Sequence, residues 1–241
     1  MRRLLPLALL LALVPGVALA QSVQLDLGGS GAGATARLVQ LTALIGLLSL
    51  APSLLVMATA FARITIVLSL LRTALGAPSI PPNPVLIGLA LFLTFFVMQP
   101  TLDASWTAGI QPMMEGRLNE IDGLTAAAEP FRRFMAANAR DSDLQLFLEL
   151  SNLPASDPPP WRALVPAFMV SELKRAFEIG FLLFLPFLVI DLVAASLLMS
   201  LGMMMLPPSV VALPFKLIFF VLVDGWRMVA GSLVQGFATG S

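Results

Sequence analysis

Long uncharged apolar stretches alternate with short polar ones along most of this chain. Between Arg37 and Arg63 lie 25 residues without a charge, and between Arg72 and Asp103 lie 30 more. At 1.5 Å per residue, a helix of some 20 residues crosses the roughly 30 Å hydrocarbon core of a bilayer. The first stretch therefore predicts a membrane-type helix over residues 38–60, kinked at Pro52.

Prolines divide the second uncharged stretch. Residues 79–84 read Ser-Ile-Pro-Pro-Asn-Pro, and each proline removes a backbone donor and fixes φ. We therefore expect a helix over 85–99, closed by Pro100. Two further apolar helices are predicted over 171–199 and 210–233.

The residues between these helical pairs are more polar. Phe131, Phe134 and Met135 recur at helical spacing, so residues 103–170 are expected to form a small helical insert. The predicted fold is an all-α membrane protein in which two long helical hairpins, 37–102 and 171–241, flank this insert.

The first twenty residues have the three regions of a signal peptide. Two arginines are followed by an apolar run, and Ala18-Leu19-Ala20 matches a small-x-small cleavage site. We expect cleavage after residue 20, with residues 21–36 as a flexible lead-in that is rich in glycine.

The distribution of charge predicts an orientation. The connection 61–84 carries Arg63 and Arg72 and no acidic residue, whereas residues 100–178 carry seven basic and eleven acidic ones. The positive-inside tendency then places 61–84 in the cytoplasm as a loop and the insert outside. The signal peptide independently sends the mature N-terminus to the same outer side.

Composition narrows the functional classes. Hydrophobic residues make up 58% and charged residues 12%, against about 25% charged in a soluble domain. His and Cys are absent, which excludes thiol chemistry, imidazole or thiolate metal sites and His-based catalysis. Lys and Arg number 14, as do Asp and Glu, so no basic excess points to nucleic acid, and no cofactor is predicted.

Three ionisable residues lie within the predicted apolar helices: Asp191, Lys216 and Asp224. An unpaired charge at mid-bilayer costs at least about 2.5 kcal/mol, so these groups are expected to face protein or water. Asp191 and Lys216 are candidates for an ion pair, within one chain or between subunits. A structural pair is one interpretation, and a direct role in moving a small solute is the other.

Methionines cluster before Pro207-Pro208. Met199, Met203, Met204 and Met205 fall within seven residues, beside Gly202. Because methionine is unbranched and adapts its shape, the cluster is either a deformable seal at a hairpin tip or simple apolar filling.

Two weak motifs suggest proteolysis. Ser171 and Lys174 match S-x-x-K without the companion motifs of penicillin-recognising enzymes, which leaves a Ser/Lys protease as a minor alternative. Asp191 and Asp224 lack the context of an intramembrane aspartyl protease.

Several distinctive segments occur along the chain. They are RITIVLSLLR at 63–72, PPNPVLIGLALFLTFF at 81–96, SELK at 171–174, LPFLVID at 185–191, GMMMLPP at 202–208, LPFK at 213–216 and VDGW at 223–226. Together these segments resemble the FliP family of flagellar biosynthesis and type III secretion proteins.

The resemblance implies a non-enzymatic pore subunit of the flagellar protein export gate in the bacterial inner membrane, at the flagellar basal body. It implies a pentamer-like homo-oligomer that joins FliQ-like, FliR-like and FlhB-like subunits into a helical channel for unfolded flagellar substrates. Carried over, Met203, Met204 and Met205 would form a gasket that closes the pore. An injectisome export gate is the alternative within the family.

Overall fold

A computed structural model describes residues 56–203 and 205–238, together with Val39, Leu41, Thr42, Ile45, Gly46, Ser49, Pro52 and Ser53. The predicted signal peptide and the lead-in lie outside these residues, as do ten residues of the predicted helix 38–60. The chain divides into two units, 1–49 and 50–241, and the following description concerns the second. All regular secondary structure among the described residues is helical, which confirms the all-α prediction.

Helix α3 (Phe61–Ala74) occupies most of the segment 61–84 that was expected to be a loop. Its buried apolar side chains recur every three or four residues: Ile64, Val67, Leu68 and Leu71. The expectation of a loop was wrong because an arginine here does not mark an exposed end. Arg63 is only 1% exposed, and Arg72 lies in the last turn of the helix.

Helix α4 (Asn83–Ser105) begins after Pro82 and runs through Pro100, so the predicted end at that proline was wrong. A proline inside a helix removes one hydrogen bond. Here α4 continues because it packs against α3, α6 and α10 on its way. A π-helical turn (Trp106–Ile110) and the short α5 (Gln111–Met114) extend it.

Helices α6 (Glu120–Asn138) and α7 (Asp141–Leu150) lie within the region predicted as a helical insert. The side-chain Oδ1 of Asn119 accepts a hydrogen bond of 2.8 Å from the backbone N–H of Asp122. This N-cap satisfies a donor that the first turn of α6 leaves unpaired.

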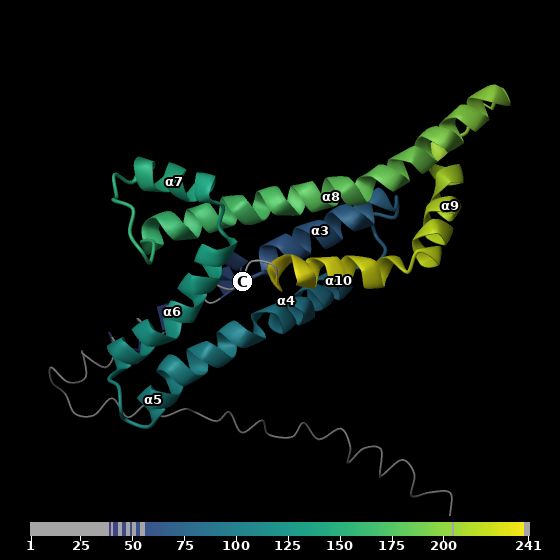
Figure 1. The fold of residues 1–241 in the computed structure, drawn as a ribbon. Coiled ribbons are helices and arrows are strands. Elements are labelled where there is room, and N and C mark those ends of the chain that lie inside the picture. Colours follow the sequence, from purple (N-terminus) through teal and green to yellow (C-terminus); the bar gives the residue numbers. More distant parts are fainter. Residues whose placement is uncertain are drawn as a thin grey trace, which may run out of the picture. The chain divides into compact units, whose positions relative to one another are not determined.

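Helix α8 (Trp161–Ser200) is 40 residues long, or about 60 Å at 1.5 Å per residue. It begins well before the predicted start at Ser171, so the expected boundary between insert and hairpin at residue 170 falls inside a helix. In Figure 1, α3 runs beside α8, and the C-terminal end of α8 continues past α3 before the chain turns back into α9.

The predicted helix 210–233 is two helices, α9 (Pro208–Leu222) and α10 (Gly225–Ala238), bent by 62°. Asp224, between them, has a φ of 51°, outside the helical range. A Cβ on Gly225 would lie 2.2 Å from Cε2 of Phe220, so the close turn after α9 requires glycine there. The single helix was predicted because apolar side chains continue across the break.

The main core lies where α3 meets α4, α8 and α10. Its fully or nearly buried side chains include Ile64, Val67, Leu71, Ala90, Ala176 and Leu233. A smaller core of Met135, Leu164 and Phe168 joins α6 to α8. Small residues permit the close approach of α8 to α3, since a Cβ on Gly180 would lie 2.2 Å from Cδ1 of Leu70.

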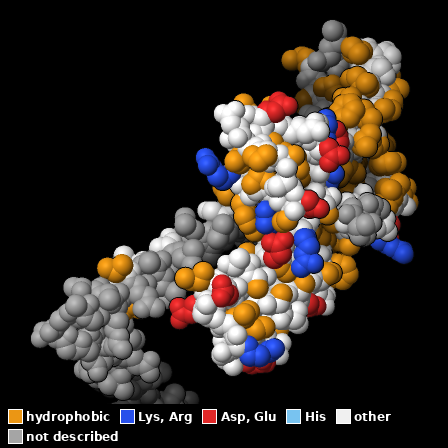
Figure 2. Space-filling view, turned by 60° about the vertical axis from the view of Figure 1, so that its left-hand side comes forward, with side chains coloured by type: hydrophobic (Ala, Val, Ile, Leu, Met, Phe, Trp, Pro, Cys, Tyr) orange, Lys and Arg blue, Asp and Glu red, His pale blue; other side chains and the backbone are white. Residues whose placement is uncertain are grey.

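The surface is divided between a polar and an apolar part. Figure 2 shows charged side chains gathered over the centre and lower part of the view, and hydrophobic ones covering the upper right. Asn83–Met114 and Trp161–Ser200 are long and apolar enough to cross a membrane, and the bent pair α9–α10 is a third candidate. These helices support the prediction of a membrane protein.

Replacing Gly109 by alanine is expected to destabilise the packing of the π-helical turn on α6. The added Cβ would lie 2.3 Å from the carbonyl oxygen of Gly123 and 2.4 Å from the backbone nitrogen of Ala127, and backbone atoms cannot move aside singly. We expect a loss of about 1–3 kcal/mol, seen as a lower thermal midpoint by circular dichroism in detergent. Gly88→Ala is the matched control, because nothing lies within 4 Å of its added Cβ. Equal midpoints for the two variants would contradict the packing described.

Candidate functional site

The methionine loop connects α8 to α9 and is held by its backbone. Gly202 has a φ of 73°, which favours glycine. Its N–H donates to the carbonyl of Met199 at 3.1 Å, and the N–H of Met203 donates to that of Leu198 at 2.9 Å. These two bonds form a Schellman motif, the helix ending that a left-handed glycine makes. The loop therefore has a defined start, and Pro207 precedes α9 at its other end.

The described side chains of this loop are apolar and exposed. Met205 is 99%, Met199 63% and Met203 43% exposed, while Met204 lies outside the described residues. Leu201 is 71% exposed beside them. A cluster of exposed apolar side chains at a hairpin tip is typical of a surface that contacts another molecule.

Lys216 joins three helices below this loop. It is 5% exposed, and its Nζ donates to Oδ2 of Asp191 on α8 at 2.7 Å and to the carbonyl of Ala74 at 3.0 Å. Ala74 is the last residue of α3, so the ammonium group also satisfies a carbonyl at the negative end of that helix. The structure thus brings Asp191 and Lys216 together within one chain.

Asp224 does not join this pair. It lies at the break between α9 and α10, where its side chain is 68% exposed and its Oδ2 is 3.9 Å from Nη1 of Arg227. An exposed ion pair of this kind contributes little to stability. The sequence predicted Asp224 and Lys216 within one continuous helix, 210–233, but the structure breaks that helix at Asp224.

A second buried ion pair joins Arg63 of α3 to Glu172 of α8. The Nε of Arg63 donates to Oε2 of Glu172 at 2.8 Å, and Nη2 contacts Oε1. Nη1 donates to the carbonyl of Gly236 at 3.3 Å, and the guanidinium carbon lies 3.7 Å above the ring of Phe237. The pair therefore also fixes the C-terminal end of α10.

Sequence reasoning missed this pair. It assigned Arg63 to a loop and gave Glu172 no partner, although the two residues are fully buried. A signal was present in the small residues that recur every four or five positions around Glu172, namely Ala163, Ala167, Ser171, Ala176 and Gly180. Such spacing marks a helix face that packs closely. Arg72, the other residue assigned to the loop, donates to the carbonyl of Pro81 at 3.3 Å and helps to close the turn before α4.

The geometry does not support a Ser/Lys protease. Ser171 is 0% exposed. Its Oγ accepts the N–H of Arg140 at 2.9 Å and lies 2.7 Å from Oδ2 of Asp143, an acceptor for its proton. Lys174 is 49% exposed, and its Nζ is 3.9 Å from Oε1 of Glu178. Ser171 therefore anchors α7 on α8, and the ammonium group of Lys174 lies beside Glu178 at the surface.

The carboxylates also lack the arrangement of an aspartyl protease. Asp191 is bound by Lys216, and Asp224 is next to Arg227, so each has its own cation. Among the described residues, no three Asp or Glu side chains come together as metal ligands. The arrangement favours holding helices together over chemistry on a substrate.

Comparison with known proteins identifies the family. The model of the FliP family matches residues 44–233. The chain belongs to the FliP family. Its relatives include flagellar biosynthetic protein FliP of Caulobacter vibrioides, 57% identical over 97% of this chain and 89% of the relative. The protein of that name in Agrobacterium fabrum is 47% identical over 98% of this chain and 99% of the relative, and that of Bacillus subtilis is 49% identical over 83% and 91%.

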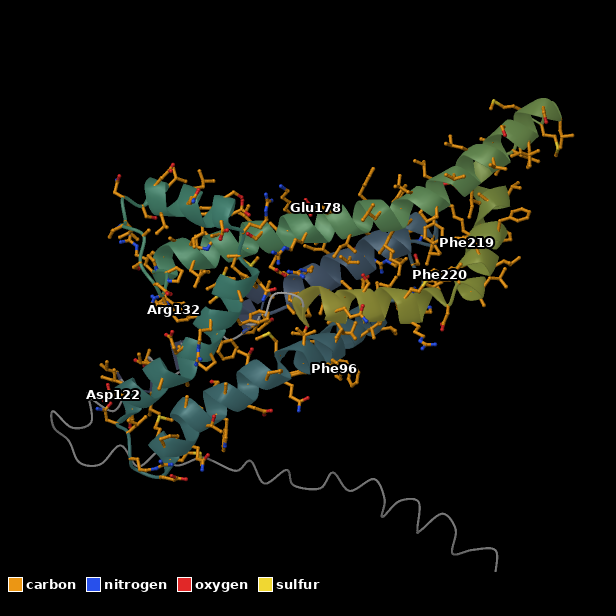
Figure 3. All side chains as sticks on the ribbon, in the orientation of Figure 1. Phe96, Asp122, Arg132, Glu178, Phe219 and Phe220 are labelled. Atoms are coloured by element: carbon orange, nitrogen blue, oxygen red, sulfur yellow. The ribbon has the colours of Figure 1, made fainter. Side chains whose placement is uncertain are left out.

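In this FliP-family chain, removing the charge of Glu172 is expected to be strongly destabilising. Glu172→Gln leaves the guanidinium of Arg63 buried without its counter-ion, a change that typically costs about 3–5 kcal/mol. The measurement is the free energy of unfolding in detergent. The matched control is Glu178→Gln on the same helix, whose side chain points away from α3 in Figure 3 and is 60% exposed. A similar effect from both changes would refute the importance of the buried pair.

Lys216 and Asp191 are expected to be energetically coupled. Asp191→Ala and Lys216→Ala each leave the other residue's charge without its partner, whereas the double variant removes both charges. The double variant should then be more stable than the sum of the single effects predicts, by about 1 kcal/mol or more. Unfolding free energies of the four proteins give this coupling. Additive effects would mean that the contact contributes nothing of its own.

Proposed function

We propose that this chain is a pore-forming core subunit of the flagellar protein export gate. In this role it passes unfolded flagellar subunits across the bacterial inner membrane for flagellum assembly. The flagellar biosynthetic names of its relatives support a place in the flagellar export apparatus as a structural component and not as an enzyme. Membership of the FliP family supports the same assignment.

The observation that carries the pore proposal is the arm formed by the C-terminal half of α8 and by α9. Most of its outward side chains are apolar, among them Phe181, Val189, Leu192, Leu197, Phe215 and Leu222. The arm ends in the exposed methionines. Such an arm needs other apolar surfaces to cover its sides, and copies of the chain arranged around an axis would bring their methionine loops together at its centre.

Methionine suits a seal at such a centre. Its flexible thioether fills irregular spaces, so a ring of methionine side chains closes on itself and yields to a passing polypeptide. The fixed backbone of the loop holds Met203 and Met205 at the tip while their side chains adapt. In this proposal the seal excludes ions when no substrate is present.

The proposed assembly is a pentamer-like homo-oligomer with FliQ-like, FliR-like and FlhB-like subunits, in contact with membrane lipid. The mature N-terminus and the insert face the periplasm at the flagellar basal body. The acidic excess of residues 100–178 supports that orientation. The flagellar names of the relatives favour this apparatus over an injectisome.

A small-solute transporter using Asp191 and Lys216 is less well supported. A solute site needs polar groups that are free to exchange partners. Lys216 is instead nearly fully buried and already bound to Asp191 and to the end of α3.

Replacing Met203, Met204 and Met205 together by serine is expected to make assembled gates leak ions. Serine keeps the backbone of the loop and removes the apolar seal, so water enters the constriction. The measurement is ion conductance of the purified gate complex in planar bilayers. Leucine at the three positions is the matched control and should stay closed, because it is apolar and similar in volume. A serine variant as tight as the unmodified complex would rule out the seal.

A further inference from the structure

The described methionines range from fully buried to fully exposed. Met135 and Met98 are 0% and 1% exposed, within helical cores. At the tip of the α8–α9 hairpin, Met205 is 99% and Met203 43% exposed. Because the chain contains no cysteine, methionine supplies all of its oxidisable sulfur. Small oxidants therefore meet the thioethers of the tip before those of the cores.

We propose that Met203 and Met205 are sites of reversible oxidation by peroxides, and that this oxidation opens the gate. The second half of the inference rests on the proposed seal, whereas the first depends only on the accessibility of the two sulfur atoms. The oxidant is a two-electron oxygen donor such as hydrogen peroxide.

The reaction is balanced without any group from the protein besides the side chain. A lone pair of the thioether sulfur attacks one oxygen of hydrogen peroxide, an S–O bond forms and the O–O bond breaks. The remaining oxygen leaves as water with both protons. Sulfur loses two electrons and becomes a sulfoxide, and the peroxide is reduced.

The loop is built to accept this change without unfolding. Its turn depends on backbone bonds, from the N–H of Met203 to the carbonyl of Leu198 and from that of Gly202 to the carbonyl of Met199. The side chains of Met203 and Met205 take no part in those bonds. Oxidation therefore alters the polarity of the tip while the helix ending remains. Oxidation at Met135, by contrast, requires the core between α6 and α8 to open.

The polarity change acts directly on a seal made of thioethers. A sulfoxide oxygen is a strong hydrogen-bond acceptor and binds water, whereas a thioether does so weakly. Hydrated side chains at the constriction admit water and ions. Methionine sulfoxide reductases restore the thioether, so the opening is reversible.

The test exposes the purified gate complex to hydrogen peroxide and follows two quantities. Peptide mass spectrometry gives the oxidation rate of each methionine, and planar-bilayer recording gives ion conductance. We expect the peptide with Met203 and Met205 to oxidise several-fold faster than those with Met98 and Met135. Conductance should rise over the same period and fall again after treatment with methionine sulfoxide reductases.

Two variants separate the tip from other exposed methionines. The complex with Met203→Leu, Met204→Leu and Met205→Leu has lost the three thioethers of the proposed seal, so peroxide should not raise its conductance. Met114→Leu removes a methionine that is 72% exposed at the end of α5, and this complex should respond like the unmodified one.

The outcomes distinguish the two proposals. Oxidation at the tip no faster than in the cores overturns the assignment of the sites. A tip that oxidises without raising conductance, in a complex whose serine variant does leak, overturns the opening while the seal stands. A serine variant that does not leak overturns the seal, and the opening with it.

Discussion

Burying a cation in an apolar chain requires a partner for it, and this requirement fixes how α3, α8, α9 and α10 meet. Among the described residues, Arg63 and Lys216 are the buried cations. Arg63 reaches from α3 to Glu172 of α8 and to the end of α10, and Lys216 reaches from α9 to Asp191 of α8. Separating any of these helices leaves a charge without its counter-ion, at a cost of several kcal/mol. The two contacts thus define one arrangement among many that apolar packing alone would allow.

The same arrangement explains why so much of the surface is apolar. In its first half α8 buries a face of small residues against α3 and turns Lys174 and Glu178 outward. In its second half only Asp191 is charged, and α9 covers just one side. At about 60 Å, α8 is also twice as long as a hydrocarbon core is thick. The helix is therefore longer than one crossing of a bilayer requires, and its apolar half needs lipid or another apolar surface to cover it.

The sequence predicted the fold class correctly, but it misplaced several ends of helices. Long uncharged stretches and the absence of His and Cys were sufficient to predict an all-α membrane protein without thiol or imidazole chemistry. The errors arose where the expectation rested on the neighbouring sequence alone, while contacts with distant residues determined the structure. Pro100 did not end α4, because packing against neighbouring helices holds the helix on both sides of it. Arg63 did not mark a loop, because Glu172 of α8 provides a counter-ion for the buried guanidinium. The partner of Arg63 lies 109 residues away, a distance at which periodicity carries no information.

The methionine loop, by contrast, was visible in the sequence because its signals are local. Glycine at 202 and proline at 207 delimit it, and the structure shows that backbone hydrogen bonds hold the turn between them. The side chains at the tip thus contribute little to folding, while the ion pairs below hold the base of the arm. The backbone and the ion pairs therefore fix where the tip lies, and the methionine side chains determine its chemical character. A change in the polarity of Met203 or Met205 would leave these backbone hydrogen bonds in place and would alter only the chemical character of the exposed tip.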